Sequence, residues 1–131
     1  AVLSLLAGAI AIAVARRPAP PDASSARASA ELRLADQRLR EGRLAGGGDS
    51  ALDHLLAAKG AQPADPRVAA RLTLVADKFE QLGAGALTRQ NFGEAAVHFE
   101  AALKADPARE SARKRLAEIA AAKSPGSARR K

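Results

Sequence analysis

The chain has 131 residues, of which 47% are apolar, and a formal net charge of +7 at pH 7. It contains no Cys, Met, Trp or Tyr and only three Phe. These counts exclude disulfide bonds and a thiol nucleophile, and they leave few rings on which nucleic-acid bases could stack. A chain of this length and composition is expected to form one helical domain.

The positive charge lies at the two ends of the chain. Residues 1–48 carry seven basic and four acidic side chains, and residues 109–131 carry eight and two, whereas residues 49–108 carry six and eight. The C-terminal basic residues could touch lipid head groups or nucleic-acid phosphates, or simply be solvated. They are Arg109, Arg113, Lys114, Arg115 and the tail Ala128 to Lys131. Without aromatic platforms, no specific nucleic-acid partner is expected.

Residues 1–17 are expected to meet a membrane. Ala1 to Ala15 is an unbroken apolar run, which Arg16 and Arg17 close. A spanning helix needs about 20 apolar residues, so the run is typical of the C-terminal part of a truncated transmembrane anchor. The alternative is a signal segment, whose core is about 7 to 15 residues. We favour the anchor because an Arg pair flanks helices ordinarily and is a poor cleavage context. Whether the domain is periplasmic or cytoplasmic is left open, with the periplasm preferred.

Residues 18–29 are rich in Pro, Ala and Ser, and they predict a disordered linker. The first helix is expected from Ala30 to about Ala45, because Leu32, Ala35 and Leu39 fall on one face. The next three residues, Gly46 to Gly48, are interpreted as a loop. A phosphate-binding loop would need a preceding strand and a following Lys-Ser or Lys-Thr, and the sequence offers neither.

Capping residues delimit the following helices. Asp49-Ser50 predicts a cap for a second helix from Ala51 to about Gly60, and Asp65-Pro66 predicts the start of a long amphipathic helix that reaches about Gln90. Asn91 is expected to make the turn into a fourth helix, Gly93 to Ala105.

Asp106-Pro107 repeats the capping pair, and Ala112, Leu116, Ile119 and Ala120 predict a fifth helix with its arginines outside. The helical domain is expected to span residues 30–122, followed by a disordered basic tail, residues 123–131.

The stretch from Phe79 to Pro107 resembles a tetratricopeptide repeat. The family's spacing of apolar, small and terminating residues is met at Phe79, Leu82, Gly83, Ala86, Ala95, Phe99, Ala102 and Pro107. Phe79 stands where the family prefers Trp, and Ala86 where it prefers Tyr. The resemblance implies a helical hairpin in which Gly83 and Ala95 allow close approach, while Phe79, Leu82, Phe99 and Ala102 fill the space between the helices.

A degenerate second unit lies upstream. Ser50 to Pro63 aligns with Glu94 to Pro107 at an offset of 44 residues, against a family period of about 34. The alignment pairs Ala51 with Ala95, His54 with His98, Leu55 with Phe99, Ala58 with Ala102 and Pro63 with Pro107, and Leu34-Ala35 can stand against Leu82-Gly83. Because such arrays usually need about three repeats, a marginal monomer or a homodimer is expected.

No catalytic residue, metal ligand or cofactor is predicted. His54 and His98 occupy equivalent places in the two related helices, but a metal site needs three or four convergent ligands and the sequence offers no full set. Asp49, Ser50 and His54 contain the letters of a hydrolase triad. Ser50 is needed as a helix cap, however, and no nucleophile elbow is present.

The resemblance therefore implies a non-catalytic scaffold that binds a protein or peptide partner, and the apolar run of residues 1–15 adds the expectation of a membrane anchor. The Ala- and Arg-rich composition is compatible with a bacterial cell-envelope protein. The alternative is a helical stalk or spacer of a larger membrane protein whose active domain lies upstream.

By the resemblance, partner contacts are expected on the outward side of the long helix. Those residues are Asp77, Glu80, Gln81, Ala84 and Thr88. The two carboxylates among them predict a partner segment that carries Lys or Arg.

Overall fold

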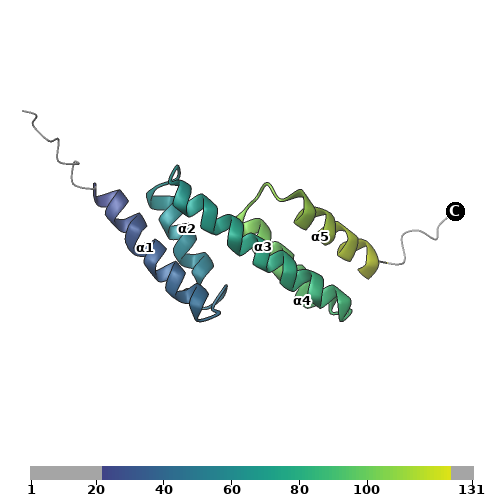
Figure 1. The fold of residues 1–131 in the computed structure, drawn as a ribbon. Coiled ribbons are helices and arrows are strands. Elements are labelled where there is room, and N and C mark those ends of the chain that lie inside the picture. The colour runs from purple at the N-terminus through teal and green to yellow at the C-terminus, as the bar shows by residue number, and fades with distance from the viewer. Residues whose placement is uncertain (1–21, 125–131) are drawn as a thin grey trace, which may run out of the picture.

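The computed structural model describes residues 22–124, and within this range the chain forms five α-helices and no strand. The all-helical prediction is confirmed for this range. The helices are α1 (Ala23–Arg40), α2 (Ala51–Ala61), α3 (Pro66–Thr88), α4 (Phe92–Ala105) and α5 (Glu110–Lys123). They follow one another along an elongated molecule, with the long α3 in the middle (Figure 1). The predicted anchor or signal segment, residues 1–17, lies outside the described residues, as do residues 125–131 of the predicted tail.

The first helix begins earlier than predicted. α1 starts at Ala23, so residues 23–29 of the expected linker are helical. Asp22 caps the helix, because its carboxylate accepts a hydrogen bond of 2.7 Å from the backbone N–H of Ser25. Ala28 is completely buried against the rest of the domain. A local cap and this packing outweigh the linker-like composition, and Ala is in any case the best helix former.

The same helix also ends earlier than predicted, at Arg40 rather than near Ala45. Gly42 adopts a left-handed conformation, with φ of +73°. The N–H of Gly42 then donates to the carbonyl of Leu39, and the N–H of Arg43 donates to the carbonyl of Arg38. This pair of bonds is a Schellman motif, which satisfies the last carbonyls of a helix and stops it.

Other helix boundaries agree with the predicted caps. Ser50 and Asp53 form a capping box at the start of α2, and Asp65 caps α3, whose first residue is Pro66. Asn91, which was predicted only to make the turn, also caps α4, because its side-chain oxygen accepts a hydrogen bond from the backbone N–H of Glu94.

The prediction that Asp106-Pro107 would start the fifth helix is wrong. α5 begins at Glu110, and the N-cap residue Arg109 makes no side-chain capping bond. The carboxylate of Asp106 instead accepts hydrogen bonds within the turn, from the backbone N–H of Ala108 and from Arg109 Nε. Ala120, expected on the buried face of α5, is exposed.

α3 and α4 pack as a hairpin around Phe99. Phe79, Ala95, Phe99 and Ala102 are buried between the two helices, as predicted. The helices approach closely at Gly83, where an added Cβ would lie 2.8 Å from the Phe99 ring. Leu82 is the exception, because its side chain is 42% exposed rather than packed inside the hairpin.

α1 and α2 form a second hairpin with the same pattern of burial. Ala51, Leu55 and Ala58 of α2 are buried, like their aligned partners in α4. In α1, Ala35 is buried and Leu34 is exposed, which matches Gly83 and Leu82 in α3. The two hairpins share one apolar core, which extends from Leu32 to Ile119.

An ion pair also links the two hairpins. The guanidinium of Arg71 on α3 donates two hydrogen bonds, of 2.7 and 2.8 Å, to the carboxylate of Asp36 on α1. This bidentate contact lowers the pKa of Asp36. The first and third helices are therefore held at a defined separation.

Candidate partner-binding groove

A groove runs between the loop that joins α1 to α2 and the α3–α4 hairpin. Its first part, of about 300 Å³, is lined by Leu39, Gly42, Leu44, Lys78, Gln81 and Leu82. Its second part, of about 420 Å³, shares Gly42, Leu44 and Leu82 and adds Ala45, Gly46, Phe79, Val97, His98 and Ala101. The shared residues make the two parts continuous, and we call the whole the loop groove.

The walls of the loop groove carry exposed apolar side chains. Val97 of α4 is 62% exposed and Leu82 of α3 is 42% exposed, while Leu44 of the loop is half-buried. Lys78 contributes a positive charge at the rim, and Gln81 contributes an amide. Concave sites with apolar walls and a few polar groups are typical of ligand and peptide binding.

Glycines shape the wall that the loop provides. Gly42 and Gly46 have φ of +73° and +91°, and no heavy atom lies within 4 Å of where their Cβ atoms would be. The loop is nevertheless tied to α2, because the N–H groups of Ala51 and Leu52 donate to the carbonyls of Arg43 and Leu44 at 2.9 and 3.0 Å. The wall is thus an ordered segment of backbone.

Asp49, at the end of this loop, is the centre of a charged cluster. Its carboxylate accepts a 2.9 Å hydrogen bond from Nε of Arg38 on α1, forms an ion pair with Nη2 of the same residue at 2.8 Å, and lies 3.3 Å from Arg43. His54 Nε2 is 2.8 Å from the same carboxylate. Hydrogen bonds from Arg38 and His54 lower the pKa of Asp49 to about 2.

His54 lies between two carboxylates. The sequence pointed to His54 only as a metal ligand or a triad member, and these two contacts were not predicted. Its Nε2 faces Asp49, and its Nδ1 is 2.7 Å from Glu31 Oε2 on α1. A carboxylate only accepts hydrogen bonds, so both contacts are satisfied only when both ring nitrogens carry a proton. Accordingly, hydrogen bonds to Asp49 and Glu31 raise the pKa of His54.

The structure separates the five predicted partner-binding residues. Gln81 lines the loop groove, and Ala84 and Thr88 are exposed further along α3, where the Thr88 hydroxyl donates to the carbonyl of Ala84. Asp77 and Glu80 both form ion pairs with Arg109. Because these carboxylates already have a partner within the chain, the predicted preference for a Lys- or Arg-bearing segment loses its basis.

Arg109, which was predicted to lie outside, joins α5 to α3. Its side chain is only 14% exposed, and it contacts Asp77, Glu80 and Asp106 while donating to the carbonyl of Thr73. Burial by itself lowers the pKa of Arg109, but hydrogen bonds to the three carboxylates outweigh burial and raise that pKa. This guanidinium is therefore committed to the fold and is not available for lipid or nucleic acid.

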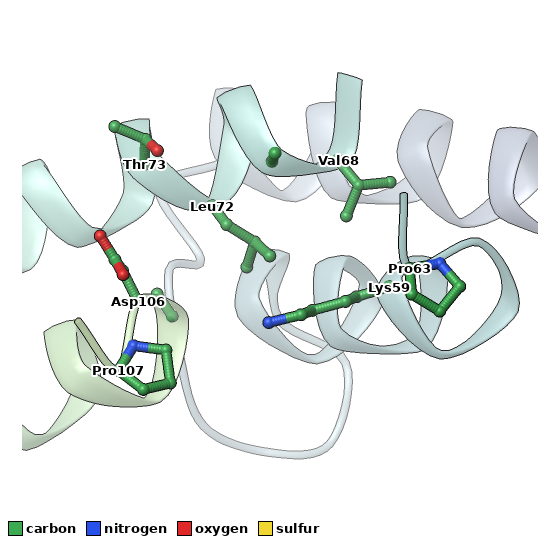
Figure 2. A pocket seen from close by; sticks show the side chains of 9 residues that line it. Lys59, Pro63, Val68, Leu72, Thr73, Asp106 and Pro107 are labelled. Carbon is green, nitrogen blue, oxygen red and sulfur yellow. The ribbon is translucent and has the colours of Figure 1, made fainter. Parts of the chain in front are cut away.

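A smaller cleft lies on the other side of α3. It has a volume of about 180 Å³, and Pro63 and Pro107, which the internal alignment pairs, stand at opposite ends of it (Figure 2). Val68 and Leu72 of α3 point into the cleft, and the Lys59 side chain extends along it (Figure 2). Its volume is less than half that of the second part of the loop groove, so we take the groove as the better candidate.

The residues weighed for catalysis and metal binding all lie within the described part of the chain. The Ser50 hydroxyl donates a 2.6 Å hydrogen bond to the carboxylate of Asp53 within the capping box, and Ser50 is buried. Among residues 22–124, no cluster of three or more His, Asp or Glu side chains could hold a metal ion.

A scan against protein-family models, a search of curated proteins and a search of solved structures each found no match to this chain. In the part of the chain that the structure describes, no helix has the length and apolar character needed to cross a membrane.

Residues of the groove that the sequence reasoning missed are Leu44, Leu82 as a surface residue, and Val97. Leu44 follows Gly42 by two residues, and a Gly after a helix is a known stop signal that would have placed Leu44 in the loop. For Val97 and Leu82, helical periodicity leaves an apolar residue at the edge of a buried stripe, and only the neighbouring elements decide its exposure.

Proposed function

We propose that this chain is a non-catalytic, membrane-anchored helical scaffold that binds a segment of another protein in the loop groove. The observation that carries the proposal is the pair of exposed apolar side chains, Leu82 and Val97, that line the groove together with Leu44. Isolated surface apolar residues need no explanation, but apolar residues that gather around a concavity favour a binding site.

The resemblance to tetratricopeptide repeats supports the same proposal. Such domains present the outward side of the first helix of each unit to partners, and Gln81 on that side of α3 also lines the groove. Gly83, Phe99 and the buried alanines at the motif positions are consistent with a hairpin of that type. The proposed partner segment is apolar, with room for an acidic group near Lys78.

Site-specific photo-crosslinking in the source cells tests this function. A photoreactive residue at Val97, inside the groove, is expected to capture a discrete partner, whereas the same residue at the exposed Lys114 of α5 is not. Leu82→Glu should abolish the capture at Val97, because a carboxylate in an apolar contact must be desolvated. Since Leu82 is already 42% exposed, the Leu82→Glu variant should have nearly the same melting curve as the wild-type chain.

Leu74→Glu is the matched control, since Leu74 lies on the same helix, is similarly exposed at 47%, and does not line the groove. Equal capture by the wild-type chain and the Leu82→Glu variant would contradict binding in the groove. A complete lack of crosslinks from the groove would favour the stalk or spacer alternative.

The membrane attachment is a separate part of the proposal, supported by the apolar run of residues 1–15. Cell fractionation with an alkaline wash tests it. The full chain should stay with the membrane pellet, and a chain that begins at residue 22 should not. Recovery of both in the soluble fraction would contradict attachment through this run.

A further inference from the structure

One of the contacts that hold the end of the loop depends on a single proton, and it stands beside the ion pairs of Asp49 with Arg38 and Arg43. Asp49 ends the loop, and its carboxylate meets His54 of α2, whose other ring nitrogen meets Glu31 of α1. His54 and Glu31 side chains are 16% and 22% exposed, so water screens the contact only partly. We propose that protonation of His54 holds the α1–α2 loop against the α1–α2 hairpin and that deprotonation loosens this loop. Proton concentration would then regulate the position of the wall that the loop contributes to the loop groove.

This inference rests on the proposed function for its biological meaning, but not for its geometry. The charged groups around His54, which lies on α2, are Glu31 and Arg38 from α1 and Glu41, Arg43 and Asp49 from the loop. On the imidazolium, both nitrogens donate, and each carboxylate has a proton to accept.

A neutral ring has one N–H and one lone pair, so it can serve only one of the two carboxylates. Glu31 has no other ion-pair partner among the described residues, whereas Asp49 keeps Arg38 and Arg43. The single proton is therefore better placed toward Glu31, where it relieves an otherwise unpaired and largely buried carboxylate. The lone pair then faces Asp49 and repels it.

Repulsion at Asp49 is transmitted to the groove because Asp49 follows Gly46 to Gly48 directly. These three glycines all have positive φ and no contact at the Cβ position, so side-chain packing does not resist their movement. The hydrogen bonds from Ala51 and Leu52 hold the loop nearer its start, at Arg43 and Leu44. The segment between these bonds and Asp49 is Ala45 to Gly48, which includes the wall residues Ala45 and Gly46.

Spin-label distance measurements on the full chain test the inference. The chain has no native cysteine, so Ala45→Cys with Glu100→Cys places labels on the loop and on α4 without interference. At pH values below the pKa of His54 we expect one narrow distance distribution, and at pH values above it a broader one. The change should follow the His54 imidazole signal measured by NMR, with a midpoint above the ordinary histidine value of 6.5.

His54→Gln should give the broad distribution at every pH. The two N–H donors of a Gln amide are on one nitrogen, so they cannot point to two carboxylates on opposite sides as the two nitrogens of an imidazolium do. His98→Gln is the comparison variant, since His98 is the only other histidine; it lines the second part of the groove, but its ion-pair contact is with Glu94 and not with Asp49 or Glu31. This variant should keep the full pH response. A distance distribution that stays narrow through the His54 titration, or a response lost in His98→Gln and kept in His54→Gln, would overturn the inference.

The measurement needs no partner, so its failure would leave the proposed binding function standing. Conversely, a missing crosslink from Val97 would not alter the expected response of the loop.

Discussion

The ring of Phe99 lies directly against the backbone of Gly83. A Cβ atom added to Gly83 would be 2.8, 2.9 and 3.0 Å from three carbons of that ring, which is closer than side chains pack. The ring is itself buried between α3 and α4, so it has no open space into which to turn. The contact explains why a glycine stands within a helix of 23 residues.

Gly83→Ala is therefore expected to destabilise the domain. Replacing a glycine inside a helix by Ala normally gains about 1 kcal/mol, but overpacking a core costs about 1 to 3 kcal/mol, so the net loss should be about 1 kcal/mol. Gly85→Ala, two residues along the same helix, is the control. There the nearest atom is 3.5 Å away, on the mobile end of Arg89, and stability should rise. Urea denaturation measures the free energy of unfolding of both variants. An increase in both would show that the Phe99 ring moves to make room for the added methyl group.

Phe99→Ala should have the largest effect of any single substitution in the hairpin. Truncating a buried ring costs about 3 to 5 kcal/mol through lost transfer energy and a residual cavity. For a domain of this size such a loss approaches the whole free energy of unfolding. Phe92→Ala is the comparison, because Phe92 is 39% exposed and should cost much less. Similar denaturation midpoints for the two variants would show that Phe99 does not anchor the hairpin.

Gln90 occupies the place in the α3–α4 turn that Gly42 occupies in the α1–α2 loop. Its φ is +59°, and the N–H groups of Gln90 and Asn91 donate to the carbonyls of Leu87 and Ala86 in a second Schellman motif. A non-glycine residue in the left-handed region is strained by about 1 kcal/mol, so Gln90→Gly should raise stability by up to about that amount. The reciprocal change, Gly42→Ala, should lower it. Thermal melting of both variants checks the pair, and a destabilised Gln90→Gly variant would mean that the Gln side chain contributes more than the strain costs.

Arg109→Ala should loosen α5 from α3. The substitution removes hydrogen bonds to Asp77, Glu80 and Asp106, and bonds to charged groups contribute about 1.5 to 3 kcal/mol each when they are shielded from water. Partial exposure of the carboxylates reduces the expected total loss to about 2 kcal/mol. Hydrogen exchange of the α5 amides should rise selectively. Arg113→Ala, at a position that is 53% exposed, should leave the exchange nearly unchanged. Equal protection in both variants would show that the apolar contacts of Ala112 and Ile119 suffice.

His54 should make stability depend on pH in a defined direction. Its folded-state pKa is raised by Asp49 and Glu31, so the folded state binds the proton more tightly than the unfolded state does. The stabilisation is then complete below the ordinary value of 6.5 and is lost as pH rises through the folded-state pKa. The melting temperature of the wild-type chain should fall across that range, and the fall should be smaller in His54→Gln than in His98→Gln. An equal fall in both variants would assign the pH dependence to other groups.

The sequence alone was enough to predict the number of helices and most of their ends. Ser50, Asp65 and Asn91 act through hydrogen bonds to backbone groups two or three residues away, so their effect is local and can be read without the fold. The spacing of Phe79, Gly83, Ala95, Phe99 and Ala102 likewise identified the buried face of the hairpin, because residues at helical periods share one face. Local capping at Asp22 and at Gly42 was readable in the same way, and overlooking it misplaced both ends of α1.

The tertiary structure decided everything that depends on what stands beside an exposed or charged residue. The repeat motif predicted that Leu82 would lie inside the hairpin, but Leu82 is 42% exposed and lines the loop groove together with Leu39 and Leu44. Composition counted Arg109 among the basic residues of the C-terminal end, and only the fold showed that three carboxylates surround it. Glu31 and Asp49 lie 23 and 5 residues from His54, and the hairpin brings all three together. The exposure of a side chain and the charges that surround it depend on residues that are distant in the sequence, so they are determined only when those segments of the chain pack together.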